Sequence, residues 1–193
     1  MKEIIYNYDD LGLKDINNYI NRAKAVIVNS NDEILFGYVD KTYQFIGGHV
    51  EKGENDLICL SKELMEEAGI KVKTDKLKPF LVIKYYSKDY PEKGINTITT
   101  NSYYIIKTDL KPDEDKRRLM DYEEKWGYEY HYIDKEKALE VLNKNIANVK
   151  KKNTVLDTIE AVREYLKITE KWGDEIYYDM LWRFKMERTN SRY

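Results

Sequence analysis

Three glutamates lie close together in the sequence, at Glu63, Glu66 and Glu67, within a run that reads as a helix from Asn55 to Ala68. On a helical wheel, Glu66 lies about 60° to one side of Glu63 and Glu67 about 40° to the other. Like charges at these spacings destabilise a helix by roughly 0.2–0.5 kcal/mol per pair. A divalent cation such as Mg²⁺ or Mn²⁺ prefers carboxylate oxygens and would remove that repulsion. The helix alone does not decide between a cation site and an ordinary solvated acidic face.

A glycine turn precedes the helix, with Gly47 and Gly48 followed by a further carboxylate at Glu54. Glycines permit sharp turns and close approach of the backbone to a ligand. From Gly48 to Ile70 the segment resembles the Nudix box, G-x5-E-x7-R-E-U-x-E-E-x-G-U, in which U is a bulky aliphatic residue. Every defined position agrees except one, where Lys62 stands in place of arginine.

The resemblance implies an enzyme that hydrolyses a phosphoanhydride bond in a nucleoside diphosphate linked to another moiety. Water activated by Mg²⁺ or Mn²⁺ would attack phosphorus. The metal ligands implied by the resemblance are Glu63, Glu66, Glu67 and the backbone carbonyl of Gly47. The residues implied to serve catalysis are Glu63, Glu54, Lys62 and Glu123. Which glutamate is the general base stays open, since Glu63 is either a third ligand or that base.

Three of these roles carry alternatives. Glu54 would hold the loop or a metal-bound water. Lys62 keeps the charge of the family's arginine without its planar fork, so we expect weaker control of the neighbouring glutamate. A carboxylate from a later loop often completes such sites in the family, and we favour Glu123 over Glu124. An exposed charged loop is the alternative there.

Substrate contacts are predicted for Tyr86 and Phe45, whose rings could stack on a base. Tyr86 lies where dinucleoside-polyphosphate hydrolases of the family carry tyrosine, while the proline that marks ADP-ribose hydrolases is missing. A place in the core or on the sheet surface is the alternative for either ring. The identity of the nucleotide therefore stays undefined.

Two other functions remain under consideration. The first is a non-catalytic Nudix domain that binds a nucleotide or a partner as a sensor or regulator. The second is a hydrolase of RNA 5′ ends, which would need a basic groove. The intact acidic cluster favours the enzyme, because a pure binding domain does not need all three glutamates.

The composition argues against several other classes of protein. With 193 residues and a net charge of −2, the chain does not resemble a general DNA-binding or membrane-surface protein. Its single cysteine, Cys59, suggests a reducing compartment and reads as a packing residue. The N-terminus turns acidic before any apolar segment develops, and no apolar stretch is long enough for a membrane span. We therefore expect a cytoplasmic protein whose partner is a small nucleotide diphosphate.

The elements that must position these residues follow from periodicity. Residues 22–39 predict a hairpin, residues 78–88 and 97–108 two strands, and residues 128–134 a strand followed by a short helix at 135–142. The fold class is α/β (α+β), a Nudix-like α/β/α sandwich with a mixed sheet and additional C-terminal helices. We expect a Nudix hydrolase domain at residues 1–150. Residues 151–193 would form a helical extension, packed on that domain or in a homodimer interface.

Overall fold

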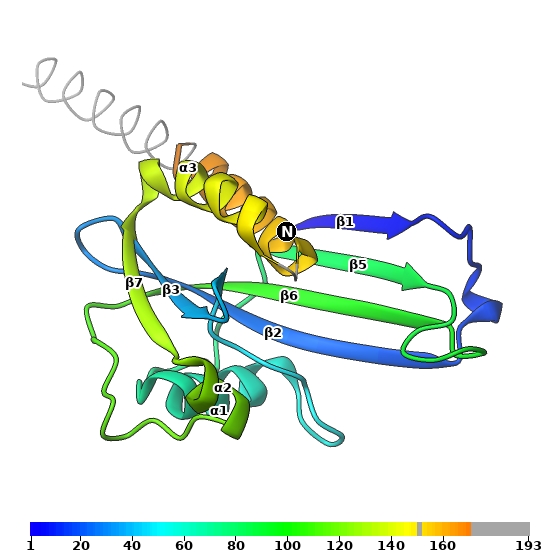
Figure 1. Cartoon of the computed structure of the whole chain (residues 1–193), viewed down its shortest axis with the longest axis horizontal. Coiled ribbons are helices and arrows are strands. Elements are labelled where there is room, and N and C mark those ends of the chain that lie inside the picture. The colour runs from blue at the N-terminus through cyan, green and yellow to red at the C-terminus, as the bar shows by residue number, and fades with distance from the viewer. Residues whose placement is uncertain (150–151, 171–193) are drawn as a thin grey trace, which may run out of the picture.

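The structure is a computed structural model, and it describes residues 1–149 and 152–170. A mixed seven-stranded sheet lies between two helical layers (Figure 1). The strands are β1 (Lys2–Asn7), β2 (Asn18–Val28), β3 (Glu33–Val39), β4 (Thr42–Gln44), β5 (Leu81–Ser87), β6 (Thr97–Lys107) and β7 (Glu129–Asp134). The helices are α1 (Asp56–Ala68), α2 (Asp121–Trp126), α3 (Lys135–Asn145) and an unlabelled one over residues 152–170. This arrangement confirms the predicted fold class.

The strand order in the sheet is β1-β5-β6-β2-β3-β4, and β7 pairs with the free side of β3. β2 runs parallel to β6 along its whole length, from Asn18 opposite Thr97 to Val28 opposite Lys107. In contrast, β2 pairs with β3 over only two residues, Ile27 and Val28, beside the predicted turn. Beyond that point the strands diverge, and the glycine turn lies against β2 through bridges at Arg22 and Ala25.

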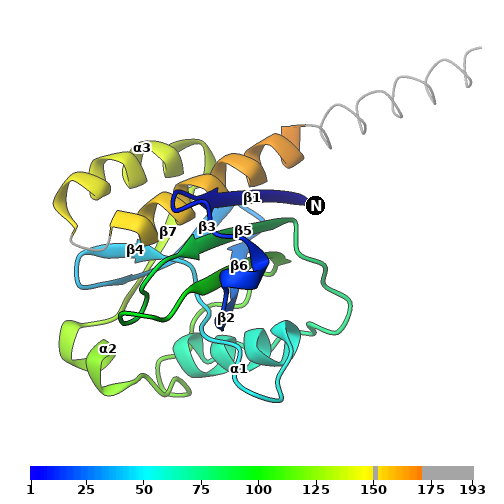
Figure 2. The same cartoon turned by 90° about the vertical axis from the view of Figure 1, so that its right-hand side faces the viewer.

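Side chains of β2 alternate between the two faces of the sheet, so the strand contributes to two separate cores. Ala23, Ala25 and Ile27 pack towards α1, whereas Val26 and Val28 belong to the core beneath α3 and the 152–170 helix. Figure 2 shows α1 on one side of the sheet and these two helices on the other. Since side chains alternate along a strand, Arg22 and Lys24 share the face of Val26.

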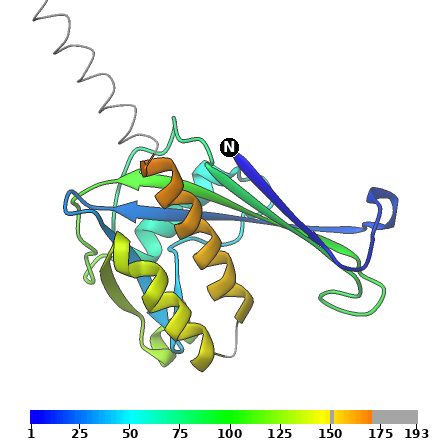
Figure 3. The ribbon, with the colours of Figure 1, turned by 90° about the horizontal axis from the view of Figure 1, so that it is seen from above.

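The 152–170 helix packs on the sheet through an apolar stripe, in which Val155, Ile159 and Val162 are buried. Figure 3 shows this helix beside α3, with the ends of β2, β5 and β6 extending beyond both. The rest of the helical extension predicted for residues 151–193 lies outside the described residues. Within the described ranges, no helix is long and apolar enough to cross a membrane.

β1 was not expected from the sequence. It adds a parallel strand to the edge of the sheet, with Lys2 opposite Leu81 and Asn7 opposite Tyr86.

Candidate functional site

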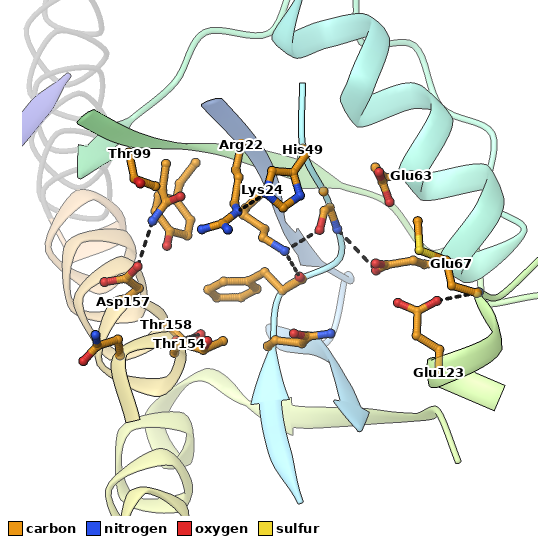
Figure 4. A pocket seen from close by; sticks show the side chains of 18 of the residues that line it. Arg22, Lys24, His49, Glu63, Glu67, Thr99, Glu123, Thr154, Asp157 and Thr158 are labelled. Atoms are coloured by element: carbon orange, nitrogen blue, oxygen red, sulfur yellow. Dashed lines mark hydrogen bonds between the residues drawn. The ribbon is translucent and has the colours of Figure 1, made fainter. Parts of the chain in front are cut away.

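A cavity of about 1080 Å³ extends from the acidic face of α1 to the 152–170 helix (Figure 4). β2, β5, β6, the glycine turn and the start of α2 supply the remaining walls. Its lining carries both signs of charge, on Arg22, Lys24, Glu51, Lys62, Glu63, Glu66, Glu67, Arg118, Glu123, Lys152 and Asp157. A site of this kind has carboxylates for a cation and cations for a phosphate.

The glycine turn approaches its neighbours too closely for any side chain. Gly47 has a φ of +137°, and a Cβ on it would lie 2.1 Å from the carbonyl oxygen of Ala23. A Cβ on Gly48 would lie 2.1 Å from Oε1 of Glu63. The two glycines therefore allow the backbone to lie directly against both β2 and a carboxylate of α1.

Local signals fix the ends of α1 as predicted. The side chain of Asn55 accepts hydrogen bonds from the backbone N–H groups of Leu57 and Ile58, both at 3.0 Å. Gly69 ends the helix in the left-handed conformation, at a φ of 63°. The acidic face is not an ordinary solvated one, because Glu63 and Glu67 are only 8% and 7% exposed.

Glu67 is the most enclosed of the three glutamates. Its Oε2 accepts hydrogen bonds from the Gly47 N–H at 3.3 Å and from the Tyr128 hydroxyl at 3.0 Å. Burial raises the pKa of its carboxyl, the ammonium of Lys24 lowers it, and the charges of Glu63 and Glu123 raise it further. Burial also raises the pKa of Glu63, again opposed by Lys24. The charge of Lys24 is therefore not enough to return the pKa of either carboxyl to its ordinary value.

Lys24 is the cation nearest to this cluster. Its Nζ donates to the Gly47 carbonyl and, at 3.4 Å, to the Phe45 carbonyl. Burial lowers the pKa of its ammonium, and Glu67 and then Glu63 raise it. Lys24 was not predicted as a site residue, although a lysine between two alanines interrupts the apolar run of β2 in the sequence.

Glu123 joins the cluster from α2 and is 2% exposed, so the alternative of an exposed loop is wrong for this residue. Its Oε2 accepts a hydrogen bond from the Met120 N–H at 2.9 Å, which holds the first turn of α2. Glu124 is exposed and lines a separate small pocket. The structure therefore brings Glu123 to the wall of the main cavity together with Glu63, Glu66 and Glu67.

Lys62 and Glu54 lie on the loop side of the site. Nζ of Lys62 lies 3.3 Å from Oε1 of Glu51 and 4.0 Å from Oε1 of Glu54. Glu54 also accepts a hydrogen bond from the Glu51 N–H at 3.3 Å. Lys62 thus joins α1 to the preceding loop, and among the described residues its ion-pair partners are Glu51 and Glu54 rather than Glu63. Glu54 is not among the described residues that line the cavity.

The two predicted substrate contacts are placed differently. Phe45 is buried and lines the cavity. Among the described lining residues, β5 contributes Tyr85 and not Tyr86, because neighbours on a strand face opposite sides. Cys59 is fully buried in the core beneath α1, which confirms its packing role, and burial raises the pKa of its thiol to about 11.

Comparison with known proteins identifies the family. The model of the NUDIX domain matches residues 19–151, more than half of the chain. The chain belongs to the Nudix family. No curated protein matches the sequence.

Three solved structures resemble this Nudix chain. A MutT, described for Aliivibrio salmonicida and Vibrio cholerae, is 19% identical at a TM-score of 0.46, covering 75% of this chain and 97% of that one. The Ap4A hydrolase of C. elegans is 14% identical at a TM-score of 0.48, covering 79% and 98%. The NUDIX domain of Shewanella oneidensis NrtR, cocrystallised with ADP ribose, is 12% identical at a TM-score of 0.51, covering 81% and 94%. At these identities the likeness concerns the fold.

The cavity offers suitable donors for a hard cation, since Glu63, Glu66 and Glu67 of the Nudix box, together with Glu123 and the Gly47 carbonyl, all present oxygen. As they stand, however, no three acidic, histidine or cysteine side chains in residues 1–149 and 152–170 are grouped to hold a metal ion. The Gly47 carbonyl, predicted as a metal ligand, instead accepts a hydrogen bond from Lys24. The donor chemistry fits a divalent cation, which would have to replace the ammonium at that carbonyl.

Arg22 and Asp157 are two further parts of the Nudix site that were not predicted from the sequence. Arg22 donates from Nε to Nε2 of His49 at 3.2 Å. Burial, together with Arg22 and Lys24, lowers the pKa of His49. Asp157 reaches the cavity from the 152–170 helix. In the sequence it is one polar position beside an apolar stripe, which is typical of a solvated helix face.

Proposed function

We propose that this Nudix domain is a pyrophosphohydrolase that hydrolyses a phosphoanhydride bond in a nucleoside diphosphate linked to another moiety. The observation that supports it most is one cavity in which buried carboxylates, Glu63, Glu67 and Glu123, face the cations Arg22 and Lys24. Phosphoryl and nucleotidyl transfer require mainly positioning and stabilisation of charge, and this lining offers both.

The residues divide the work by charge. Bound to Glu66, Glu67 and the Gly47 carbonyl, with Glu63 either a third ligand or the general base, Mg²⁺ or Mn²⁺ would neutralise phosphate charge and lower the pKa of a water. Arg22 lies between these carboxylates and Asp157 (Figure 4), where its guanidinium suits a phosphate oxygen. If Glu63 is the base, it accepts the proton of the attacking water, and burial raises the pKa of its carboxyl.

A non-catalytic Nudix domain that binds a nucleotide is the second candidate. One observation favours it, namely that the Lys24 ammonium lies at the Gly47 carbonyl where a cation would otherwise bind. A domain of this kind would use the same cavity without turnover. The predicted homodimer and cytoplasmic location stay predictions from the sequence.

The experiment that separates the two is a panel of nucleoside diphosphate derivatives incubated with Mg²⁺ or Mn²⁺ and analysed for nucleotide products. We expect turnover by the wild type and a loss of about 100-fold or more in Glu67→Gln, as for other deletions of a group that stabilises charge. Glu124→Gln, an exposed glutamate outside the cavity, is the matched control and should keep wild-type rates. If no derivative is hydrolysed and Glu67→Gln binds nucleotides like the wild type, the enzyme assignment fails.

A further inference from the structure

The end of the cavity that faces the 152–170 helix has a different chemistry from the end at α1. The helix contributes Thr154, Asp157 and Thr158, and β6 contributes Thr99 and Asn101. Hydroxyl, amide and carboxylate groups thus replace the glutamate cluster. The match to the Nudix family ends at residue 151, so the helical part of this wall lies outside it.

Asp157 and Asn101 form a buried polar pair at this end. Nδ2 of Asn101 donates to Oδ2 of Asp157 at 2.9 Å, and the Tyr85 hydroxyl donates to Oδ1. The two residues are 8% and 5% exposed. Each carboxylate oxygen has a further lone pair, so Asp157 can accept additional hydrogen bonds.

The pair leaves one acceptor without a partner. Because the amide nitrogen of Asn101 faces the carboxylate, its Oδ1 points elsewhere, and in the described part of the chain it is the single buried side-chain polar atom with no hydrogen bond. Buried polar groups are nearly always paired, so this exception is unusual. The oxygen is itself shielded from the cavity, so the group of the pair that can meet a ligand is the carboxylate of Asp157.

The order of charged and polar groups from one end of the cavity to the other matches a nucleotide. Figure 4 shows Arg22 and Lys24 between Asp157 on one side and Glu67 on the other. Arg22 is also opposite Asn101 in the register of β2 and β6. A diphosphate beside the two cations would place its nucleoside towards Asp157 and its second moiety or a cation towards the glutamates.

We propose that Asp157, held in place by Asn101, selects the base of the substrate, and that this base carries an amino group which donates a hydrogen bond to the Asp157 carboxylate. This inference rests on the proposed function, because it assigns the nucleoside end of the same cavity. The 152–170 helix is then part of the binding site, and Asp157 is a specificity-determining residue as well as a link from the helix to β5 and β6.

Matched ligands that differ by one amino group test the proposal. The α,β-methylene diphosphates of adenosine and purine riboside form one pair, and those of guanosine and inosine form the other. Their binding to the full chain is measured by calorimetry in Mg²⁺, where the methylene bridge prevents hydrolysis. In at least one pair the wild type should bind the amino-bearing member about tenfold more tightly, as expected for a charge-assisted hydrogen bond.

Asp157→Asn should reduce this preference to about twofold or less, and Asn101→Ala should do the same if the first variant does not fold. Glu160→Gln is the control, because Glu160 pairs with Arg163 on the same helix and does not line the cavity. It should keep the wild-type preference.

A purely structural role for Asp157 predicts a different result, in which both members of a pair weaken equally and the melting temperature falls. That result overturns the proposal, as does a wild type that binds no member of either pair or does not discriminate within them. Discrimination by the wild type without hydrolysis of any natural nucleotide would leave the subsite intact and reject the proposed enzyme instead.

Discussion

Replacement of Lys24 by methionine tests how the charged end of the cavity is held together. Its ammonium is buried, donates to the Gly47 and Phe45 carbonyls, and is the main positive charge acting on Glu67. Methionine preserves much of the chain length and apolar volume. The substitution therefore removes the charge and its hydrogen bonds while Glu67 stays buried.

The magnitude follows from that burial. Removal of a hydrogen bond from a charged donor costs about 1.5–3 kcal/mol, and for a chain of this size each kcal/mol lowers the melting temperature by about 2–4 °C. We expect a decrease of roughly 3–12 °C at pH 8 in the absence of divalent cations. The decrease should be smaller at low pH, where Glu67 takes up a proton.

The sign of this pH dependence follows from the pKa of Glu67, which burial raises above its ordinary value of 4.5. A carboxyl with a raised folded-state pKa contributes stability below its unfolded pKa and loses it as the pH rises through the folded value. Without Lys24 the pKa of Glu67 rises further, so the difference between variant and wild type should grow between pH 5 and pH 8.

Thermal unfolding measured at both pH values, with and without Mn²⁺, checks these expectations. Mn²⁺ should restore more stability to Lys24→Met than to the wild type, because the cation no longer competes with an ammonium. Lys84→Met is the matched control, since Lys84 also lies on a strand but forms a half-exposed pair with Glu3 at 2.6 Å. It should change stability by about 1 kcal/mol or less. A Lys24→Met protein as stable as this control at pH 8 would refute the reasoning.

Three further outcomes are expected. Gly48→Ala should reduce turnover strongly, because the new Cβ would displace the Glu63 carboxylate. Gly12→Ala, whose added Cβ would meet only the side chains of Asp15 and Lys14 away from the cavity, should reduce it far less, and equal rates for the two variants would contradict this reasoning. Lys62→Arg should raise the rate a few-fold, since a planar fork can bond both carboxylates of the preceding loop; kinetics showing an unchanged or lower rate would count against it. Burial raises the pKa of Asp157 to about 6, from a reference value of 3.8, so the wild type should lose about 3 kcal/mol of stability as the pH rises from about 4 to 7. Denaturant titrations should show that the stability of Asp157→Asn changes less with pH than that of the wild type. Equal changes with pH in the two proteins would disprove the raised pKa of Asp157.

The sequence predicted the elements whose signals are local. The ends of α1 follow from Asn55 and Gly69, and the hairpin of β2 and β3 from the turn residues between them. β1 was not predicted because the strand that pairs with it is distant in the chain, with Lys2 opposite Leu81. A six-residue strand at a sheet edge has no periodicity long enough to identify it.

The site shows the same division. A helical wheel places Glu63, Glu66 and Glu67 on one face, but it does not show what covers that face. Burial of two of these carboxylates arises from the glycine turn and from residues far away in the sequence, such as Tyr128 just before β7. Lys24 likewise becomes part of the site only because the turn after β4 lies alongside β2.

Two parts of the chain line the cavity, and our proposals assign the reaction to one part and the choice of nucleotide to the other. The glutamates, the glycine turn and the cations of β2 all lie within the segment that matches the Nudix family, and in the proposed function they carry the hydrolysis of a phosphoanhydride. Asp157, Thr154 and Thr158 come from the helix that follows this segment. Sequence changes on that helix face can therefore alter which nucleotide binds without touching the carboxylates, so long as Val155 and Ile159 keep the helix packed on the sheet.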